Sequence, residues 1–136
     1  MTQTWARSSW RTTRRLLAEI PDESLWRGDV IRLAHDPSLG PESPPADFML
    51  FELWGYDDLL GLLKLKGYKA GMPFLYFPKE SQGDGIRSLE TSWLVENWAK
   101  WFVYSYHLDE NDQPIALPIE GTLIIRRSKP APRLKV

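Results

Sequence analysis

The sequence predicts an α+β fold built on a curved, mainly antiparallel sheet of about six strands, either open or partly closed into a barrel. Two observations favour this class. Several short segments alternate apolar and polar residues with a period of two, and hairpin-length connections join them. Helical periodicity is confined to an N-terminal segment and to a tryptophan-rich segment near residues 90–102. The 136 residues contain no internal repeat or domain-length linker, so we expect a single domain over residues 1–136.

The first expected element is a short amphipathic helix over residues 8–20, which ends at Pro21. Its apolar stripe consists of Trp10, Thr13, Leu17 and Ile20, and its other side carries Arg7, Arg11, Arg14 and Arg15. We therefore divide the domain into an N-terminal helical segment (1–25), a core (26–126) and a basic tail (127–136).

Strands are expected next over residues 26–34, 48–54 and 74–77, and the proline-rich segment 36–47 is expected to be an exposed loop. Leu63 and Leu65 alternate with Lys64 and Lys66, which predicts a half-buried strand whose lysines lie in solvent. The glycines of GYKAG (67–71) predict a tight turn or bulge. The segment lacks the GxxxxGK[ST] spacing of a phosphate-binding loop.

The tryptophan-rich segment TSWLVENWAKWFVYSY (91–106) changes period part-way along. Leu94, Trp98, Trp101 and Phe102 stand at i, i+4, i+7 and i+8, which predicts that they form the buried face of a helix. Trp93 lies off this stripe, and the sequence leaves open whether it contacts a partner. From residue 102 the period becomes two, so a strand should follow directly, then a turn at DENDQP and a last strand over 119–125.

Composition excludes several classes of protein. The chain has no cysteine, which rules out disulfides and thiolate sites, and its formal net charge of −1 gives no general field for nucleic acid or membranes. It contains no run of about 18 apolar residues and no signal-peptide pattern, so we expect neither membrane insertion nor export. A cytoplasmic location is the resulting expectation.

Candidate catalytic residues are scarce. The two histidines, His35 and His107, lie too far apart in sequence for metal-ligand spacing, and no GxSxG motif is present. The acidic groups at 57–58 and 109–112 are interpreted as solvated turns rather than cation sites. We therefore expect no enzyme activity, no metal and no cofactor.

Several motifs together nevertheless resemble a known family. The motifs are WRGDVIRL, DFMLFEL, GYKAG, the FP at 77–78 and TSWLVENWAKWFVY, and they span roughly residues 26–106. In this order they resemble the bacterial polymorphic-toxin immunity protein family forty-five. The strongest element is the Trp-Leu-x-x-Asn-Trp-x-x-Trp pattern formed by Trp93, Leu94, Asn97, Trp98 and Trp101.

The resemblance implies a small protein that binds and neutralises a cognate toxin, and it carries no catalytic residues. The missing export signal favours a toxin that acts in the cytoplasm. Acidic residues gather between residues 33 and 63 and between 101 and 125, which suits a basic partner, although solvated loops explain them equally well. The expected toxin-binding residues are Trp54, Tyr56, Asp57, Asp58, Trp93, Asp109, Glu110 and Asp112. The alternatives are a nucleic-acid-binding module that uses the N-terminal arginine helix and a general protein-interaction adaptor.

Overall fold

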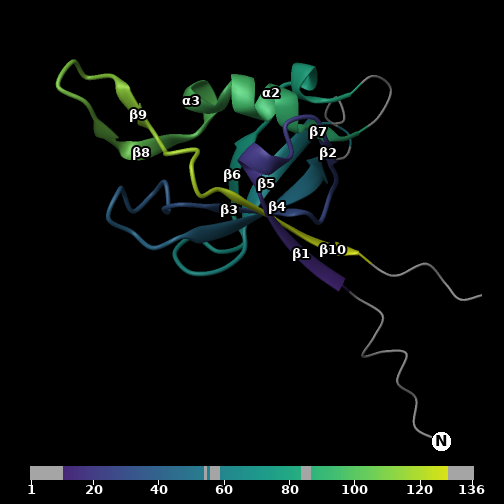
Figure 1. Cartoon of the computed structure of the whole chain (residues 1–136). Coiled ribbons are helices and arrows are strands. Elements are labelled where there is room, and N and C mark those ends of the chain that lie inside the picture. Colours follow the sequence, from purple (N-terminus) through teal and green to yellow (C-terminus); the bar gives the residue numbers. More distant parts are fainter. Residues whose placement is uncertain (1–10, 54, 56–58, 84–86, 129–136) are drawn as a thin grey trace, which may run out of the picture.

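A computed structural model describes residues 11–53, 55, 59–83 and 87–128 of the chain. Figure 1 shows the arrangement of its elements. Its strands are β1 (Arg11–Leu16), β2 (Ser24–Leu25), β3 (Val30–Leu33), β4 (Ala46–Leu53), β5 (Leu59–Lys64), β6 (Pro73–Tyr76), β7 (Leu89–Glu90), β8 (Val103–Leu108), β9 (Pro114–Ala116) and β10 (Leu123–Ser128). Its helices are the 3-10 turns η1 (Leu17–Glu19) and η2 (Lys79–Ser81) and the α-helices α2 (Thr91–Glu96) and α3 (Trp98–Trp101).

The main sheet has six antiparallel strands in the order β1-β10-β3-β4-β5-β6. Two small sheets, β2–β7 and β8–β9, accompany it, and α2 and α3 lie over one side of the main sheet (Figure 1). The predicted α+β class and antiparallel sheet are therefore confirmed. Of the two alternatives left open by the sequence, the sheet is open rather than closed into a barrel, because β1 and β6 form its opposite edges and do not pair with each other.

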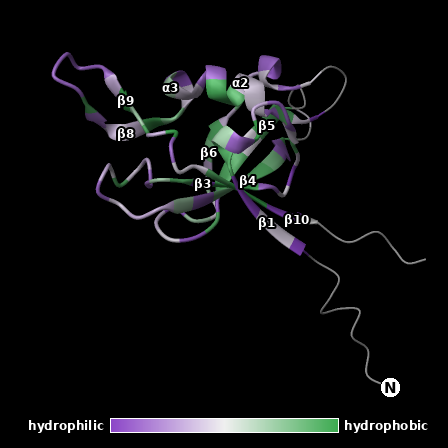
Figure 2. Ribbon diagram, in the orientation of Figure 1, coloured by the Kyte–Doolittle hydropathy of each residue, from purple (hydrophilic) through white to green (hydrophobic). Residues whose placement is uncertain are grey.

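The hydrophobic core lies between the main sheet and the helices. Neighbouring strands align their inward side chains, so that Ile124 stands opposite Ile31 and Ile31 stands opposite Phe48. These three residues are almost fully buried. Figure 2 shows hydrophobic residues gathered on the central strands and hydrophilic ones on the loop between β8 and β9. The core therefore requires pairings between segments that are far apart in sequence.

The tryptophan-rich segment forms two short helices rather than one. Asn97 lies between them, and its side-chain amide and its backbone N–H both donate to the Trp93 carbonyl, each at 2.9 Å. The indole of Trp98 stacks on Phe102 with ring centroids 4.0 Å apart, and its Nε1 donates to the Leu117 carbonyl at 2.9 Å. Leu94, Trp98 and Phe102 lie in the core as expected, whereas Trp101 is only partly buried and packs at its margin.

The N-terminal helix predicted over 8–20 is wrong for the residues that the structure describes. Residues 11–16 form β1, which pairs along its whole length with β10, and all six of its side chains are exposed. Two members of the expected stripe are buried nevertheless. Leu17 begins the 3-10 turn η1, and Ile20 directly follows that turn. Residues 8–10 of the predicted helix lie outside the described residues.

Candidate functional site

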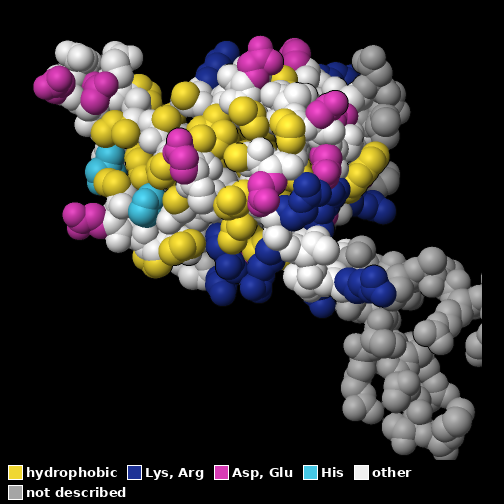
Figure 3. All heavy atoms as spheres, viewed as in Figure 1, with side chains coloured by type: hydrophobic (Ala, Val, Ile, Leu, Met, Phe, Trp, Pro, Cys, Tyr) yellow, Lys and Arg dark blue, Asp and Glu magenta, His cyan; other side chains and the backbone are white. Residues whose placement is uncertain are grey.

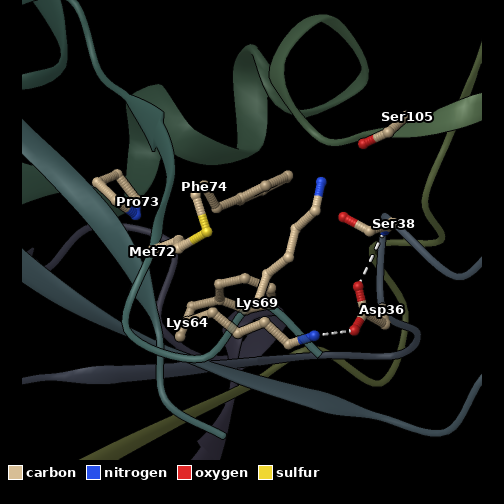
Figure 4. A pocket seen from close by; sticks show the side chains of 9 residues that line it. Asp36, Ser38, Lys64, Lys69, Met72, Pro73, Phe74 and Ser105 are labelled. Carbon is tan, nitrogen blue, oxygen red and sulfur yellow. Dashed lines mark hydrogen bonds and ion pairs between the residues drawn. The ribbon is translucent and has the colours of Figure 1, made fainter. Parts of the chain in front are cut away.

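The structure has a small pocket at the end of the sheet nearest the β8–β9 hairpin. Its volume is about 170 Å³. Four parts of the chain supply it: the loop after β3, strand β4, the β5–β6 hairpin with its turn, and strand β8. The lining residues are Asp36, Ser38, Phe48, Lys64, Lys69, Met72, Pro73, Phe74 and Ser105. Figure 4 shows their arrangement.

A buried ion pair forms the floor of this pocket. The Nζ of Lys64 donates to the Asp36 carboxylate, and each side chain is only 6% exposed. The other Asp36 oxygen accepts the Ser38 backbone N–H at 2.9 Å. The prediction that Lys64 lies in solvent is wrong, since Lys64 stands opposite Phe48 on the core face of the sheet. The lysine is buried where the loop after β3 brings a carboxylate to it.

The GYKAG segment folds into the predicted tight turn, which fixes Lys69 at the pocket mouth. The Gly71 N–H donates to the Lys64 carbonyl at 2.8 Å and the Ala70 N–H to the Gly67 carbonyl at 3.0 Å. Lys69 adopts a left-handed backbone conformation with φ of 63°, which is uncommon for a residue with a side chain. The turn thereby directs the lysine toward the pocket (Figure 4).

Aromatic rings hold the Lys69 ammonium group. Its Nζ lies 5.4 Å from the centre of the Tyr68 ring and 5.8 Å from that of Tyr106, within cation–π range. The Tyr106 hydroxyl is 3.5 Å away. Within the part of the chain that the structure describes, no carboxylate forms an ion pair with Lys69. The pocket therefore carries one positive charge that is not balanced by an acid.

The loop after β3 reaches the pocket by packing against β8. The Ser105 N–H donates to the Pro37 carbonyl at 2.9 Å, and the His107 ring covers Gly40 so closely that a Cβ there would lie 2.5 Å from its Cε1. Gly40 also has φ of +99°, which favours glycine. The loop expected to be exposed is thus partly buried, at Asp36, Pro37 and Gly40.

Large apolar side chains are exposed around the pocket, and we call them the pocket rim. They are Leu39, Tyr68, Met72 and Tyr106. Tyr106 is 70% exposed and Leu108, further along the hairpin, is 57% exposed. Scattered exposed apolar residues are normal, but a group around a hollow is typical of binding surfaces.

The tip of the β8–β9 hairpin carries the acidic residues expected to contact a partner. Asp109 shapes the turn, since its Oδ1 accepts the backbone N–H groups of Asn111 at 2.8 Å and Gln113 at 2.9 Å. Glu110 and Asp112 are exposed. Figure 3 shows acidic side chains at this tip, with hydrophobic side chains beside it. Three expected site residues therefore lie in the turn that follows the exposed side chains of Tyr106 and Leu108 on β8.

Among the other expected site residues, the structure describes only Trp93, which is not part of this hairpin. Trp93 lies on α2, where its ring packs edge-on against Phe77 with centroids 6.0 Å apart and lies 5.9 Å from Trp101. Trp54, Tyr56, Asp57 and Asp58 lie outside the described residues.

Three of the six acidic residues between residues 33 and 63 form ion pairs within the fold. Besides the Asp36–Lys64 pair, Asp47 forms a two-pronged pair with Arg32, at 2.7 and 3.1 Å, which raises the pKa of the arginine. Glu52 lies 3.7 Å from Arg27 and 3.5 Å from an Arg87 nitrogen. Glu42 remains exposed. The acidic field expected from the described part of this stretch is therefore reduced, whereas the acidic side chains of Glu110 and Asp112 at the hairpin tip are exposed.

The arginines expected to serve a nucleic acid are partly engaged as well. Of the four arginines of the predicted helix, Arg15 pairs with Glu23 at 3.0 Å, whereas Arg11 and Arg14 are exposed on β1. Arg7 lies outside the described residues. The ion pair of Arg15 competes with phosphate contacts.

The pocket itself is not predictable from local sequence patterns. Its lining residues extend from Asp36 to Ser105, so no local motif joins them. The available signal is the run of large side chains Tyr104, Tyr106 and Leu108 along β8. Only Tyr104 is buried, and burial raises the pKa of its phenol. The strand therefore extends past the core and carries Tyr106 and Leu108 into solvent.

The described residues define a small α+β protein with an exposed apolar and acidic surface. They contain no group of three or more side chains suited to hold a metal ion, and no helix among them is long and apolar enough to cross a membrane. A protein-family model described as immunity protein 45 matches residues 17–111. The chain therefore belongs to the immunity protein 45 family, as the sequence motifs indicate. Neither the curated proteins nor the solved structures include a significant match.

Proposed function

We propose that this protein neutralises a cognate bacterial toxin by direct, stoichiometric binding, and that it has no catalytic activity of its own. Membership of an immunity protein family supports the general role. The observation that carries the mode of action is the surface formed by the pocket rim and the β8–β9 hairpin. On that hairpin, the exposed side chains of Tyr106 and Leu108 precede the acidic residues of the tip.

The chemistry of this surface suits inhibition of an enzyme with a basic substrate cleft. Acidic residues at the hairpin tip attract such a cleft and speed association, while desolvated aromatic residues supply most of the affinity. The projecting hairpin in Figure 1 has the shape needed to enter a cleft and block access to it. A toxin that acts in the cytoplasm, such as a nuclease, is the partner that we propose.

The test is co-expression with a candidate toxin encoded next to this gene. We expect growth to be rescued and a one-to-one complex to co-purify. Tyr106→Ser combined with Leu108→Ser should weaken that complex by about 30-fold or more, as the loss of interface hot spots does. Val95→Ser, which changes an exposed apolar residue on α2, is the matched control and should leave affinity unchanged.

The acidic tip is tested separately. Glu110→Gln with Asp112→Asn should lower the association rate and its salt dependence, because charges at the edge of an interface guide the approach of the two proteins. Asparagine tolerates the left-handed backbone of Asp112, whose φ is 59°. Glu120→Gln changes an exposed acid elsewhere and serves as the control. A complex that withstands both hairpin variants would place the binding surface elsewhere, and failure to rescue growth or form a complex would refute the proposed function.

A further inference from the structure

The pocket beneath the rim has the size of one side chain. Its volume of about 170 Å³ is below the roughly 300–1,000 Å³ of sites that hold cofactors and drug-sized ligands. Its walls combine the Phe48 and Phe74 rings with hydroxyl and ammonium groups. Such a hollow beside an exposed aromatic rim is typical of the sockets that receive a partner's anchor residue.

The charges in the pocket select an anionic guest. Asp36 is already engaged by the Lys64 ammonium and the Ser38 N–H, so these groups cancel and leave little capacity for a cationic guest. Lys69 adds a positive charge that no described acid balances. Figure 4 shows its ammonium end between Ser38 and Ser105. The hydroxyls of these two serines form no hydrogen bond within the described part of the chain, so both can donate to an oxygen.

The cation is held in place before a guest arrives. The left-handed Lys69 backbone and the hydrogen bonds of the 67–71 turn fix its Cα, and the Tyr68 and Tyr106 rings restrict its side chain. Restricting a group in its bound geometry lowers the entropy that binding must overcome. A hydrogen bond to a charged group is also strengthened when apolar walls exclude water.

We propose that this pocket receives the carboxylate of an Asp or Glu side chain from the toxin. Lys69 supplies the counter-charge, and Ser38 and Ser105 donate hydrogen bonds to the carboxylate oxygens. This inference rests on the proposed function and specifies one contact within it. The partner surface then combines a basic region opposite the hairpin tip with one acidic anchor opposite the pocket.

The first experiment measures the affinity of the toxin complex by calorimetry. Lys69→Met removes the charge but keeps the length of the side chain, and it should weaken binding by about 10–100-fold, the range for a lost charge-assisted contact. Lys66→Met is the matched control, because Lys66 is exposed on the same connection and does not line the pocket. An unchanged affinity for Lys69→Met would overturn the inference while leaving the immunity function intact.

Ser105→Ala provides a second variant that removes only a hydroxyl. It should weaken the complex by several-fold without altering the thermal midpoint, so a loss caused by misfolding is recognised. On the toxin side, substitution of the anchoring carboxylate by its amide should lose as much affinity as Lys69→Met. The two changes combined should lose little more, because both remove the same contact.

A second experiment does not depend on the toxin. The peptides acetyl-Gly-Glu-Gly-amide and acetyl-Gly-Gln-Gly-amide are titrated into the isotope-labelled protein and followed by NMR. We expect the glutamate peptide alone to shift the amide signals of residues 67–72 and 105, with a dissociation constant on the order of millimolar. Lys69→Met should abolish these shifts. Equal responses to both peptides, or none, would overturn the carboxylate assignment, whereas failure of the toxin complex alone would refute the proposed function.

Discussion

The buried ion pair between Lys64 and Asp36 allows a sharp test of the core. Lys64→Met removes the cation and leaves the Asp36 carboxylate in a site where both side chains are 6% exposed. Breaking one partner of a buried pair costs about 3–5 kcal/mol, because the remaining charge is buried without compensation. For a chain of this length, that loss corresponds to a fall in the thermal midpoint of roughly 10–20 °C.

A double variant separates the charge effect from packing. Adding Asp36→Asn to Lys64→Met removes both charges, while the amide oxygen introduced at position 36 can still accept the Ser38 N–H. Replacing both members of a buried pair is much less costly, so we expect the double variant to recover to within about 1–2 kcal/mol of the wild type. Lys66→Met controls for the loss of a lysine at an exposed position and should change stability by less than about 0.5 kcal/mol.

Urea unfolding, monitored by tryptophan fluorescence, gives the free energy of unfolding for all four proteins. The unfolding slope should stay constant, so that midpoints can be compared directly. Two results would refute the reasoning: a Lys64→Met variant within about 1 kcal/mol of the wild type, or a double variant that is no more stable than the single one. The first result would show that the buried charge left on Asp36 costs little, and the second that lost packing rather than an unpaired charge causes the destabilisation.

Three further predictions concern other parts of the core. Trp98→Ala should lower the unfolding free energy by about 3–5 kcal/mol, whereas Trp98→Phe should lose much less because only the bond to the Leu117 carbonyl and part of the ring disappear; urea unfolding distinguishes them. Gly40→Ala should destabilise by about 1–3 kcal/mol and shift the NMR signal of the His107 ring, since φ is +99° and the new Cβ would lie 2.5 Å from that ring. Burial raises the pKa of Tyr104, so its contribution to stability is complete below about pH 10 and is lost as the pH rises through the folded-state pKa. Tyr104→Phe should reduce this alkaline loss of stability, and an identical pH profile would contradict the assignment.

Periodicity predicts the helix and strand of the tryptophan-rich segment because their faces are decided by local geometry. The i, i+4, i+8 spacing of Leu94, Trp98 and Phe102 has one solution that buries large apolar groups, and these three residues are buried. The spacing does not reveal the break at Asn97, where α2 ends and α3 begins.

The wrong predictions occur where the same residues fit two arrangements. These are either the two possible alternations of inward and outward side chains along a strand, or a helix and a strand. In LLGLLKLK, leucines occupy both faces of the strand, so alternation alone does not decide whether Leu62 and Lys64 or Leu63 and Leu65 face the core. Pairing with β4 selects the first arrangement and buries the lysine. In the N-terminal segment, a helical stripe and a strand are both compatible with RTTRRL, and β10 supplies the pairing that favours a strand.

Patterns along the chain are enough to predict the α+β class, most of the strands, the aromatic core and the family, because these depend on local periodicity and on the order of motifs. Which charged side chains form ion pairs and which face the pocket, in contrast, is decided by three-dimensional contacts. Folding pairs Asp36 with Lys64 across 28 positions and Asp47 with Arg32, and it leaves Lys69 facing a pocket built from four separate parts of the chain. Charge compensation depends on distances of a few ångströms between segments remote in sequence, and no local pattern encodes those distances.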